Sequence, residues 1–412
     1  MDEGEPQRER IGAAEAASRL GVKRETIYAY VSRGLLQSER HIDGKSSTFD
    51  PAEIDRFRRR KADHRPGHLE VPVTSSITEV IDGAVRYRGH LLSELIRDGL
   101  TYEAVAELLW TGELSTDTSA TWESRVEVDA AVKRSADALP RYATPTDRMM
   151  AGVVAAGAVD PFRDDRSLAG ASATARQLIL AIVDSIPPVD ASGGSSGAED
   201  PVARRLWIRL TDADPSSWPA LQTAMVALAD HGMATSTLAA RLAASTRAAP
   251  PAVLLAGLGA VAGPLHGAAS RTVHLMFEDA AERGAEAAIA EVMRRDGQVP
   301  GIGHFIHRTV DPRHDLLFEA LADYPINERH MDVVASVIAR TSDRISAAPN
   351  VDLALGALTF SSGMSADAGE VIFAIARTAG WIAHALEEYE ETPIRFRPVG
   401  RYVAPSPRAR RA

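Results

Sequence analysis

Helical periodicity dominates the sequence from about residue 70 to the C-terminus. Segments such as "LTYEAVAELLWTGEL" and "GEVIFAIARTAGWIAHALEEYE" place apolar residues at positions i, i+3, i+4 and i+7, the spacing of one helix face. Strand-like alternation is scarce, and residues 73–89 hold its best example. Much of the apolar content is alanine, which favours helix and lets helices pack closely. We therefore expect a mainly α fold with a large core in this 412-residue chain.

The composition excludes several classes of protein. The chain has no cysteine, which rules out a disulfide framework, a zinc ribbon and a cysteine nucleophile. The charged N-terminus lacks the apolar region of a signal peptide, and no run of 18 apolar residues predicts a membrane span. We expect a cytoplasmic protein that has no contact with a membrane.

The charge distribution predicts two modules with different partners. Residues 1–66 hold 14 Lys and Arg against 12 Asp and Glu, whereas the rest of the chain holds 32 against 44. Residues 61–72 mix charge with Pro and Gly, which is typical of a linker. We therefore expect one domain over residues 1–66 and a second over residues 67–412.

The first domain has the pattern of a helix-turn-helix followed by a wing. Two apolar runs at helical spacing flank an "LGV" turn, and the second helix is expected to begin near Lys23 or Arg24. The pair Asp43-Gly44 predicts a hairpin turn, and Asp50-Pro51 predicts the start of another helix. This order resembles the start of MerR-type and excisionase-type DNA-binding domains.

That resemblance implies DNA as a partner. The side chains expected to face a major groove are those of Lys23, Arg24, Thr26 and Tyr28. The same pattern also occurs in plain packing units, and a net charge of +2 is small for a DNA-binding domain. A regulatory cap or an oligomerisation element therefore stands as the alternative role.

Six polar clusters interrupt the apolar helices of the second domain. They are "ADHGMATSTLAAR" with His231, "GPLHGAAS" with His266, "GIGHFIHRTVDPRHD" with His304, His307, Arg308, Arg313 and His314, "APNVDLALG" with Asp352, "FAIARTAGW" with Arg377, and "IRFRPVG" with Arg395 and Arg397.

Each cluster alone also has a structural explanation. A single histidine is usually a core or surface residue, Arg377 could pair with a structural carboxylate, and Asp352 could be a turn residue or a helix N-cap. His304 and His307 have a spacing that suits a metal, but no third ligand is evident, and we expect no metal site. The joint occurrence of the clusters in this order is far more specific.

In their order along the chain, "GPLHG", "GIGH…DPR", "PNVD" and "ARTAGWIAH" resemble the signature segments of the citrate synthase family. The resemblance covers about residues 70–400. It implies a mostly helical homodimer with a large domain and a smaller one, at about residues 262–360, that closes over the substrates. It also implies condensation of acetyl-CoA with oxaloacetate, then thioester hydrolysis to citrate and CoA, with no cofactor.

The resemblance further implies a role for each matched residue, and these roles suit the chemistry. A methyl group beside a thioester is a weak carbon acid, so its deprotonation needs a base and a donor to the thioester oxygen. Two carboxylates of oxaloacetate suit the planar fork of arginine. The implied roles are Asp352 as base, His266 as donor to the thioester oxygen, His304 as donor to the ketone, His231, Arg313, Arg377 and Arg397 as oxaloacetate ligands, and Arg308 as a ligand of CoA phosphates.

The resemblance places Arg397 in the active site of the partner subunit, and His307 and His314 are taken as structural. Departures from the family pattern leave the matched groups in place: Gly232 follows His231, and residues 268–270 are Ala, Ala and Ser. These changes could alter CoA contacts or the choice of acyl chain.

Two alternatives remain at this point. One is 2-methylcitrate synthase, which uses propionyl-CoA, since one extra methylene changes binding by only about 1–3 kcal/mol. The other is a DNA-binding regulator that senses CoA esters or dicarboxylates through the same fold. The complete set of His266, His304 and Asp352 argues against a pure sensor, because sensing requires no base.

Overall fold

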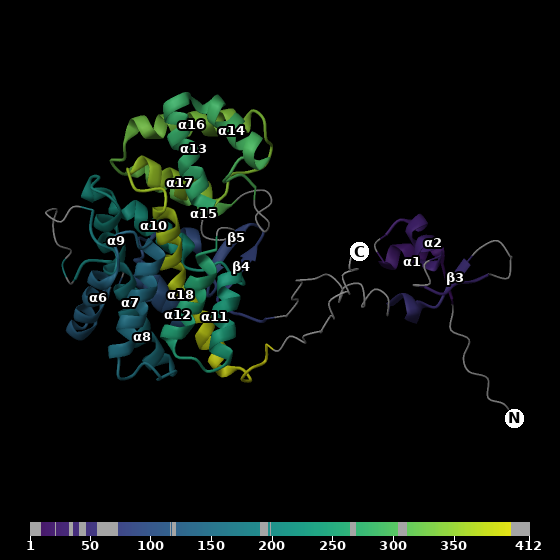
Figure 1. The fold of residues 1–412 in the computed structure, drawn as a ribbon, viewed down its shortest axis with the longest axis horizontal. Coiled ribbons are helices and arrows are strands. Elements are labelled where there is room, and N and C mark those ends of the chain that lie inside the picture. Colours follow the sequence, from purple (N-terminus) through teal and green to yellow (C-terminus); the bar gives the residue numbers. More distant parts are fainter. Residues whose placement is uncertain are drawn as a thin grey trace, which may run out of the picture. The chain divides into compact units, whose positions relative to one another are not determined.

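The chain forms two compact units, residues 1–73 and residues 74–412, each described by itself (Figure 1). The hairpin turn predicted at Asp43-Gly44 and the predicted linker at residues 61–72 lie outside the described residues. The structure is a computed structural model that describes residues 10–20, 22–32, 36–40, 47–55, 73–115, 117, 121–189, 197, 199–263, 269–303 and 311–396.

In the first unit one helix packs against a small sheet, and a second helix packs against the first. Its antiparallel strands have the order β1-β3-β2, with Ile11 opposite Phe49, and a core that includes the fully buried Ile27 and Ile54. Residues 51–55 are helical, and Asp50 Oδ1 accepts the backbone N–H of Ala52 at 2.9 Å. The elements are β1 (Ile11–Gly12), α1 (Ala13–Leu20), α2 (Arg24–Ser32), β2 (Glu39–Arg40) and β3 (Ser47–Phe49).

The second unit is built mainly of helices, which confirms the predicted fold class. It begins with an antiparallel sheet of order β4-β5-β6, formed by β4 (Thr78–Ile81), β5 (Ala84–Tyr87) and β6 (His90–Leu91). The helices that follow are α4 (Leu92–Arg97), α5 (Tyr102–Thr111), α6 (Val126–Ala138), α7 (Pro145–Val159), α8 (Leu168–Asp184), α9 (Val202–Leu210), the 3-10 helix η1 (Pro215–Ser217), α10 (Trp218–Leu228), α11 (Thr235–Ser245), α12 (Pro250–Val261), α13 (Ala269–Arg283), α14 (Ala285–Asp296), α15 (Pro312–Asp323), α16 (Glu328–Ser342), α17 (Val351–Ser361) and α18 (Ala368–Glu390).

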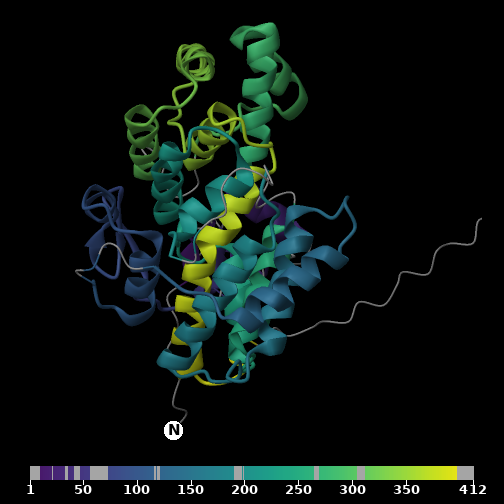
Figure 2. The same cartoon turned by 90° about the vertical axis from the view of Figure 1, so that its left-hand side faces the viewer.

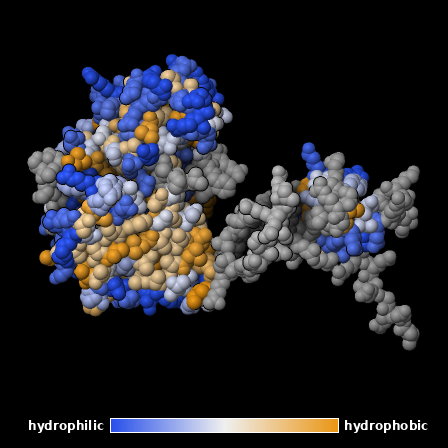
Figure 3. Space-filling view, viewed as in Figure 1, coloured by the Kyte–Doolittle hydropathy of each residue, from blue (hydrophilic) through white to orange (hydrophobic). Residues whose placement is uncertain are grey.

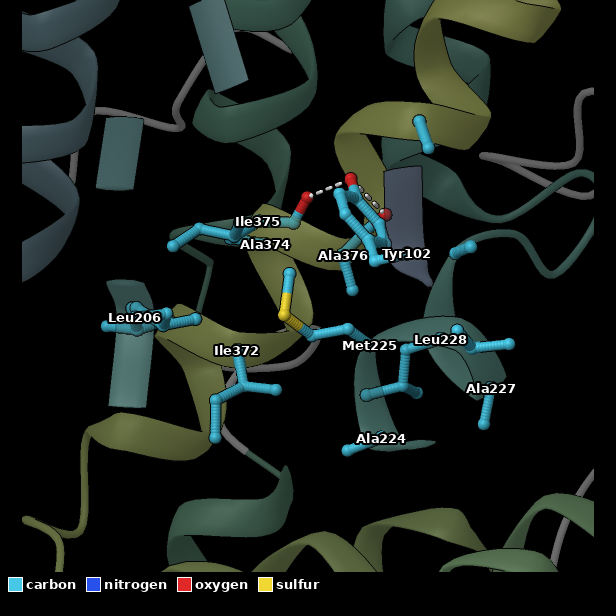
Figure 4. Packing of buried hydrophobic residues seen from close by; sticks show 14 of the residues in the cluster. Tyr102, Leu206, Ala224, Met225, Ala227, Leu228, Ile372, Ala374, Ile375 and Ala376 are labelled. Atoms are coloured by element: carbon cyan, nitrogen blue, oxygen red, sulfur yellow. Dashed lines mark hydrogen bonds between the residues drawn. The ribbon is translucent and has the colours of Figure 1, made fainter. Parts of the chain in front are cut away.

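Helix α18 runs through the centre of this unit with other helices around it (Figures 1 and 2). Of its 23 residues, 18 are buried, so it is covered on nearly all sides. Apolar side chains of α18 such as Ile372 pack against Met225 of α10 (Figure 4). In the same view the Tyr102 hydroxyl donates to the carbonyl of Ile375 at 2.9 Å, which joins α5 to α18. Polar side chains on α18 therefore lie inside the unit.

Helices α13 to α17 gather at one end of the unit, at the top of Figure 1. Helix α13 packs on α14, α16 and α17, and α15 packs on both α17 and α10. The N-termini of α15 and α17 therefore lie at the border between this helical group and the rest of the unit. No helix in the described ranges is both long enough and apolar enough to cross a membrane.

Candidate active site

The structure describes half of the residues predicted for the active site. Asp352, His231, Arg313 and Arg377 can be placed. The other four, His266, His304, Arg308 and Arg397, lie outside the described residues.

Asp352 lies in the first turn of α17, and its carboxylate does not cap the helix. The cap is Asn350, whose Oδ1 accepts the backbone N–H of Asp352 at 2.9 Å. The alternative that Asp352 is an N-cap is therefore wrong. Its carboxylate remains available for another task at the N-terminus of a helix, where negative charge is favoured.

A glycine turn is fixed against the start of α17. Gly301 and Gly303 have φ values of +78° and +82°, in the left-handed region that residues with a Cβ rarely adopt. The N–H of Gly303 donates to Ala348 O at 2.7 Å, and Asn350 Nδ2 donates to the carbonyl of Gly303, also at 2.7 Å. The backbone immediately before His304 is thus attached to the residues immediately before Asp352.

A cavity of about 470 Å³ opens beside this junction. Asp352, Asn350 and residues 301–303 form one part of its lining, and Thr272 of α13 forms another. Asp352 therefore borders a space large enough for part of a small-molecule ligand.

Arg313 is buried at the N-terminus of α15, where Asp311 orients it. The guanidinium donates from Nε to Asp311 Oδ1 at 2.9 Å and from Nη2 to Oδ2 at 2.8 Å. The same carboxylate accepts the N–H of Val351 at 3.0 Å, at the start of α17. Asp311 thus holds Arg313 and Asp352 in a fixed relation, because it joins the two helix starts that carry them.

Arg377 is a buried cation near the middle of α18. Its Nε donates to Leu228 O at 2.9 Å, and its guanidinium lies over the Phe373 ring at 4.6 Å from the centroid. Nη1 and Nη2 have no hydrogen-bond partner among the described residues. Burying donors without a partner costs free energy. A guanidinium in this state is expected where an anionic ligand binds.

His231 lies in a turn that Asp230 and Tyr87 hold in place. Asp230 is fully buried, and its Oδ2 accepts from Thr78 Oγ1 at 2.6 Å and from the N–H of Gly232 at 2.8 Å. The Tyr87 hydroxyl donates to the carbonyl of Asp230 at 3.0 Å. The conformation around His231 is therefore set by the hydrogen bonds of the fully buried Asp230.

The described site residues act on one another electrostatically. Burial raises the pKa of Asp352 above its ordinary value, Arg313 and Arg377 oppose this rise, and Asp311 adds to it. Burial also lowers the pKa of Arg377, while Asp230, Tyr87 and Asp352 oppose that fall. Arg313, Arg377 and Asp352 therefore gather in one neighbourhood, although they come from three helices.

Two buried groups of this neighbourhood have pKa values that reflect its charge. Burial would raise the pKa of Asp230, but His384, Arg377 and Thr78 outweigh burial and hold that pKa far below its ordinary range. Burial raises the pKa of Tyr87 to about 12, with a further contribution from Asp230. Asp230 is thus an ionised counter-charge inside the unit.

Sequence reasoning overlooked the residues that position the predicted oxaloacetate-binding side chains. Asp230 lies directly before His231 in "DH", and Asp311 lies two residues before Arg313 in "DPR"; this adjacency was the available signal. Tyr87 carried no such signal, since its contact with Asp230 spans 143 residues of sequence.

Comparisons with known proteins agree with this arrangement. Residues 68–399 match the family model described as "Citrate synthase, C-terminal domain". Over 349 residues the chain is 27% identical to a 2-methylcitrate synthase of Mycobacterium tuberculosis, which covers 81% of this chain and 86% of the relative. Its identity to a citrate synthase of Mycolicibacterium smegmatis is also 27%, covering 81% and 90% of the two chains.

A solved structure shows the same fold. It is the ternary complex of carboxymethyl coenzyme A and oxaloacetate with citrate synthase from Thermoplasma acidophilum. The TM-score is 0.63 at 22% identity, and the match covers 82% of this chain and 95% of that one.

The helical fold and the buried site of one carboxylate and two arginines thus belong to an enzyme of the acyltransferase class. The chain is a member of the citrate synthase family, because the family model matches most of its length.

Proposed function

We propose that the protein condenses acetyl-CoA with oxaloacetate and hydrolyses the resulting thioester to citrate and CoA. The observation that carries this proposal is Asp352, a carboxyl group of raised pKa beside a cavity and under the charge of two buried arginines. A base of raised pKa is matched to a weak carbon acid. Arg313 and Arg377 supply the positive charge that an oxaloacetate dianion requires.

In the proposed first step, Asp352 takes a proton from the methyl carbon of the acyl group. Electron density moves to the thioester oxygen, where His266 donates a hydrogen bond. The carbon then attacks the ketone of oxaloacetate, while His304 donates to the ketone oxygen. Water finally cleaves the thioester and CoA leaves.

The substrate ligands divide between the two reactants. Arg313, Arg377 and His231 bind oxaloacetate, and Arg308 binds phosphate groups of CoA. The buried positions of Arg313 and Arg377 favour tight binding, because water does not compete for their guanidinium groups. The proposed chemistry uses only these side chains and a water molecule, so we propose no metal and no cofactor.

We also place the reaction in a homodimer in the cytoplasm, with Arg397 of the partner subunit completing each oxaloacetate site. A broad apolar surface lies over α11, α12 and α18 in the space-filling view (Figure 3), and Leu242 of α11 and Ile394 are exposed apolar residues of this unit. Such a surface favours association with another protein chain.

Mixing inactive Arg397→Ala and Asp352→Asn subunits restores activity if the site is shared, whereas verified heterodimers without activity would contradict sharing.

The acyl group is the open choice within this function, because relatives with both names have similar identity. Purified protein and oxaloacetate are supplied with equal acetyl-CoA and propionyl-CoA, and both products are quantified by mass spectrometry. The ratio of products equals the ratio of kcat/KM values. A ratio in favour of citrate supports citrate synthase, and a ratio in favour of methylcitrate assigns the alternative.

A second proposed function is DNA binding by the first unit. Helix α2 buries Ile27 in the core, while Lys23, Arg24 and Tyr28 are exposed and Thr26 is half-buried. A helix with one face in the core and basic and aromatic side chains on the other suits a major groove. The unit would then link the enzyme, or a sensor of its substrates, to a gene.

Selection of duplexes from a random library by the full-length protein tests DNA binding. We expect enrichment of one sequence and its loss in the Arg24→Ala variant. Arg19→Ala is the matched control, since Arg19 pairs with Glu15 on α1 at 2.6 Å. A library without any enriched sequence would favour the role of a regulatory cap or an oligomerisation element.

A further inference from the structure

A chain of buried polar contacts leads from Asp230 through the inside of the second unit. Asp230 Oδ1 lies 3.3 Å from His384 Nε2, and both side chains are fully buried. Across the ring, His384 Nδ1 lies 2.9 Å from Arg241 Nη1. An arginine can only donate, so Nδ1 is the acceptor and the ring proton is on Nε2, facing Asp230. His384 therefore connects a carboxylate on one side to a cation on the other.

Arg241 continues the chain of contacts to the end of α18. Its Nε donates to Glu388 Oε2 at 3.0 Å. Glu388 is fully buried and also accepts two bonds from Arg395, at 2.8 and 2.6 Å. The N–H of Ile394 donates to Ser245 O at 2.8 Å. We call these contacts the buried network; its members are Asp230, His384, Arg241, Glu388 and Arg395.

One end of the network supports the oxaloacetate ligands of the same subunit. Asp230 closes the turn around His231 through its bond from Gly232, and it is the first of the charged groups acting on Arg377. Arg377 and His384 are seven residues apart on α18 and so share one helix face. Between them, Gly380 donates its N–H to Ala229 O at 3.0 Å.

The other end of the network anchors the segment that leads to Arg397. Arg395 lies only two residues before it, and its two bonds to Glu388 fix both the distance and the orientation of the guanidinium. Phe396 is buried next to it. The network thus joins the neighbourhood of His231 to the last described residues of the chain.

We propose that the buried network positions oxaloacetate ligands at both of its ends, in two different active sites. Through Asp230 it positions His231 and Arg377 of its own subunit, and through Arg395 it positions Arg397 for the partner subunit. His384 and Arg395 are therefore positioning residues. This inference rests on the proposed function, which supplies the substrate and the sharing of Arg397.

The alternative is that these buried charges only stabilise the packing of α11 on α18. Removing one partner of a buried ion pair destabilises a protein strongly, because the other charge stays buried without its partner. If the network is purely structural, substitutions in it should lower Tm and leave the affinity for oxaloacetate unchanged in the molecules that remain folded. Affinity and Tm measured on the same variants separate the two explanations.

Two substitutions divide the contacts of His384. In His384→Gln the amide nitrogen takes the position of Nε2, from which it can keep the contact with Asp230. In His384→Asn the side chain reaches only the position of Nδ1 and accepts from Arg241. We expect His384→Asn to lower the affinity for oxaloacetate, measured by calorimetry, about tenfold and to raise the oxaloacetate KM by the same factor. We expect His384→Gln to keep most of the affinity. The KM for acyl-CoA should change less than about twofold in both.

Arg395→Gln tests the other end, with Arg176→Gln as its matched control. Arg176 also makes two bonds to one carboxylate, with Glu107 at 2.6 and 2.9 Å, and it belongs to α8. We expect Arg395→Gln to raise the oxaloacetate KM about tenfold in the homodimer, and the control to leave it unchanged.

Heterodimers with Asp352→Asn subunits then show which site each residue serves. In each heterodimer the Asp352→Asn subunit has no catalytic base, so only the site of the Arg395→Gln or His384→Asn subunit is active. That site uses Arg397 of the Asp352→Asn subunit. We therefore expect a wild-type oxaloacetate KM with Arg395→Gln and a raised KM with His384→Asn.

Unchanged oxaloacetate affinity in both His384→Asn and Arg395→Gln, or a raised KM in both heterodimers, would overturn the inference. Wild-type protein that binds no oxaloacetate would overturn the proposed function itself and the inference with it.

Discussion

At the scale of single residues, the site depends on charges that are buried without full neutralisation. Arg377 has two nitrogens without a hydrogen-bond partner in the described structure, and Asp352 has a raised pKa. Both cost folding free energy. Residues of this kind persist where a ligand uses them, which is how function can oppose stability.

Asp352→Asn should therefore stabilise the protein. The ordinary pKa of the carboxyl is 3.8 and the folded value is higher, so stability is lost as pH rises from the unfolded to the folded pKa. Above the folded pKa the ionised form carries the whole cost, and the amide removes it. We expect Tm to rise by a few degrees at pH 7.5 and the gain to shrink toward pH 4. A lower Tm at pH 7.5 would contradict the account.

At the scale of elements, the close approach of α18 to residues 228–230 organises the site. A Cβ on Gly380 would lie 2.4 Å from Asp230 Oδ1 and 2.6 Å from Ala229 O, which excludes any larger residue. Arg377 also donates to Leu228 O across this contact. The same contact thus positions both the arginine and the turn that carries His231.

Gly380→Ala should destabilise the second unit by about 1–3 kcal/mol and raise the oxaloacetate KM, because α18 must move away from Asp230. Gly259→Ala on α12 is the control, since its Cβ would have no neighbour within 4 Å in the described structure. Chemical denaturation and steady-state kinetics measure both effects. A Gly380→Ala protein with wild-type stability and KM would show that the contact is not required.

A second element contact contains a pH-dependent group. Glu103 of α5 accepts the N–H of Val202 at 2.7 Å at the start of α9, and burial raises its pKa to about 7. Because the ordinary value is 4.5, this carboxyl destabilises the fold as pH rises from 4.5 to 7, and the cost is complete above pH 7. Glu103→Gln should then gain about 3 kcal/mol at pH 8 and less than about 1 kcal/mol at pH 5. Equal gains at both pH values in urea unfolding would refute this assignment.

Sequence patterns predicted the elements better than the contacts between them. Period 3.6 in the apolar residues predicts helices such as α18 directly. The pairing of Asp311 with Val351 and of Asp230 with His384 joins distant segments, so no local pattern contains it. The roles assigned to the candidate site residues stay predictions, both for the four that the structure describes and for His266, His304, Arg308 and Arg397.

At the scale of the whole molecule, the chain combines two compact units, and the family match begins only at residue 68. The described residues of the candidate active site all belong to the second unit. Catalysis and any DNA binding are thus expected to be separable by truncation.

Deleting residues 1–66 should preserve CoA release, with kcat/KM within about twofold of the full-length value. The measurement needs circular dichroism on the same sample to establish that the shortened chain is folded. A folded but inactive product would show that the first unit is part of the catalytic architecture.

The measurement that tests the central claim most directly is CoA release by wild-type protein and by Asp352→Asn, each with saturating oxaloacetate and acyl-CoA. The account predicts turnover in the wild type and a kcat lower by about 10²- to 10⁴-fold in the variant, with oxaloacetate affinity nearly unchanged. Equal turnover by both proteins, or none from a folded wild type that binds oxaloacetate, would contradict the assignment of Asp352 as the catalytic base.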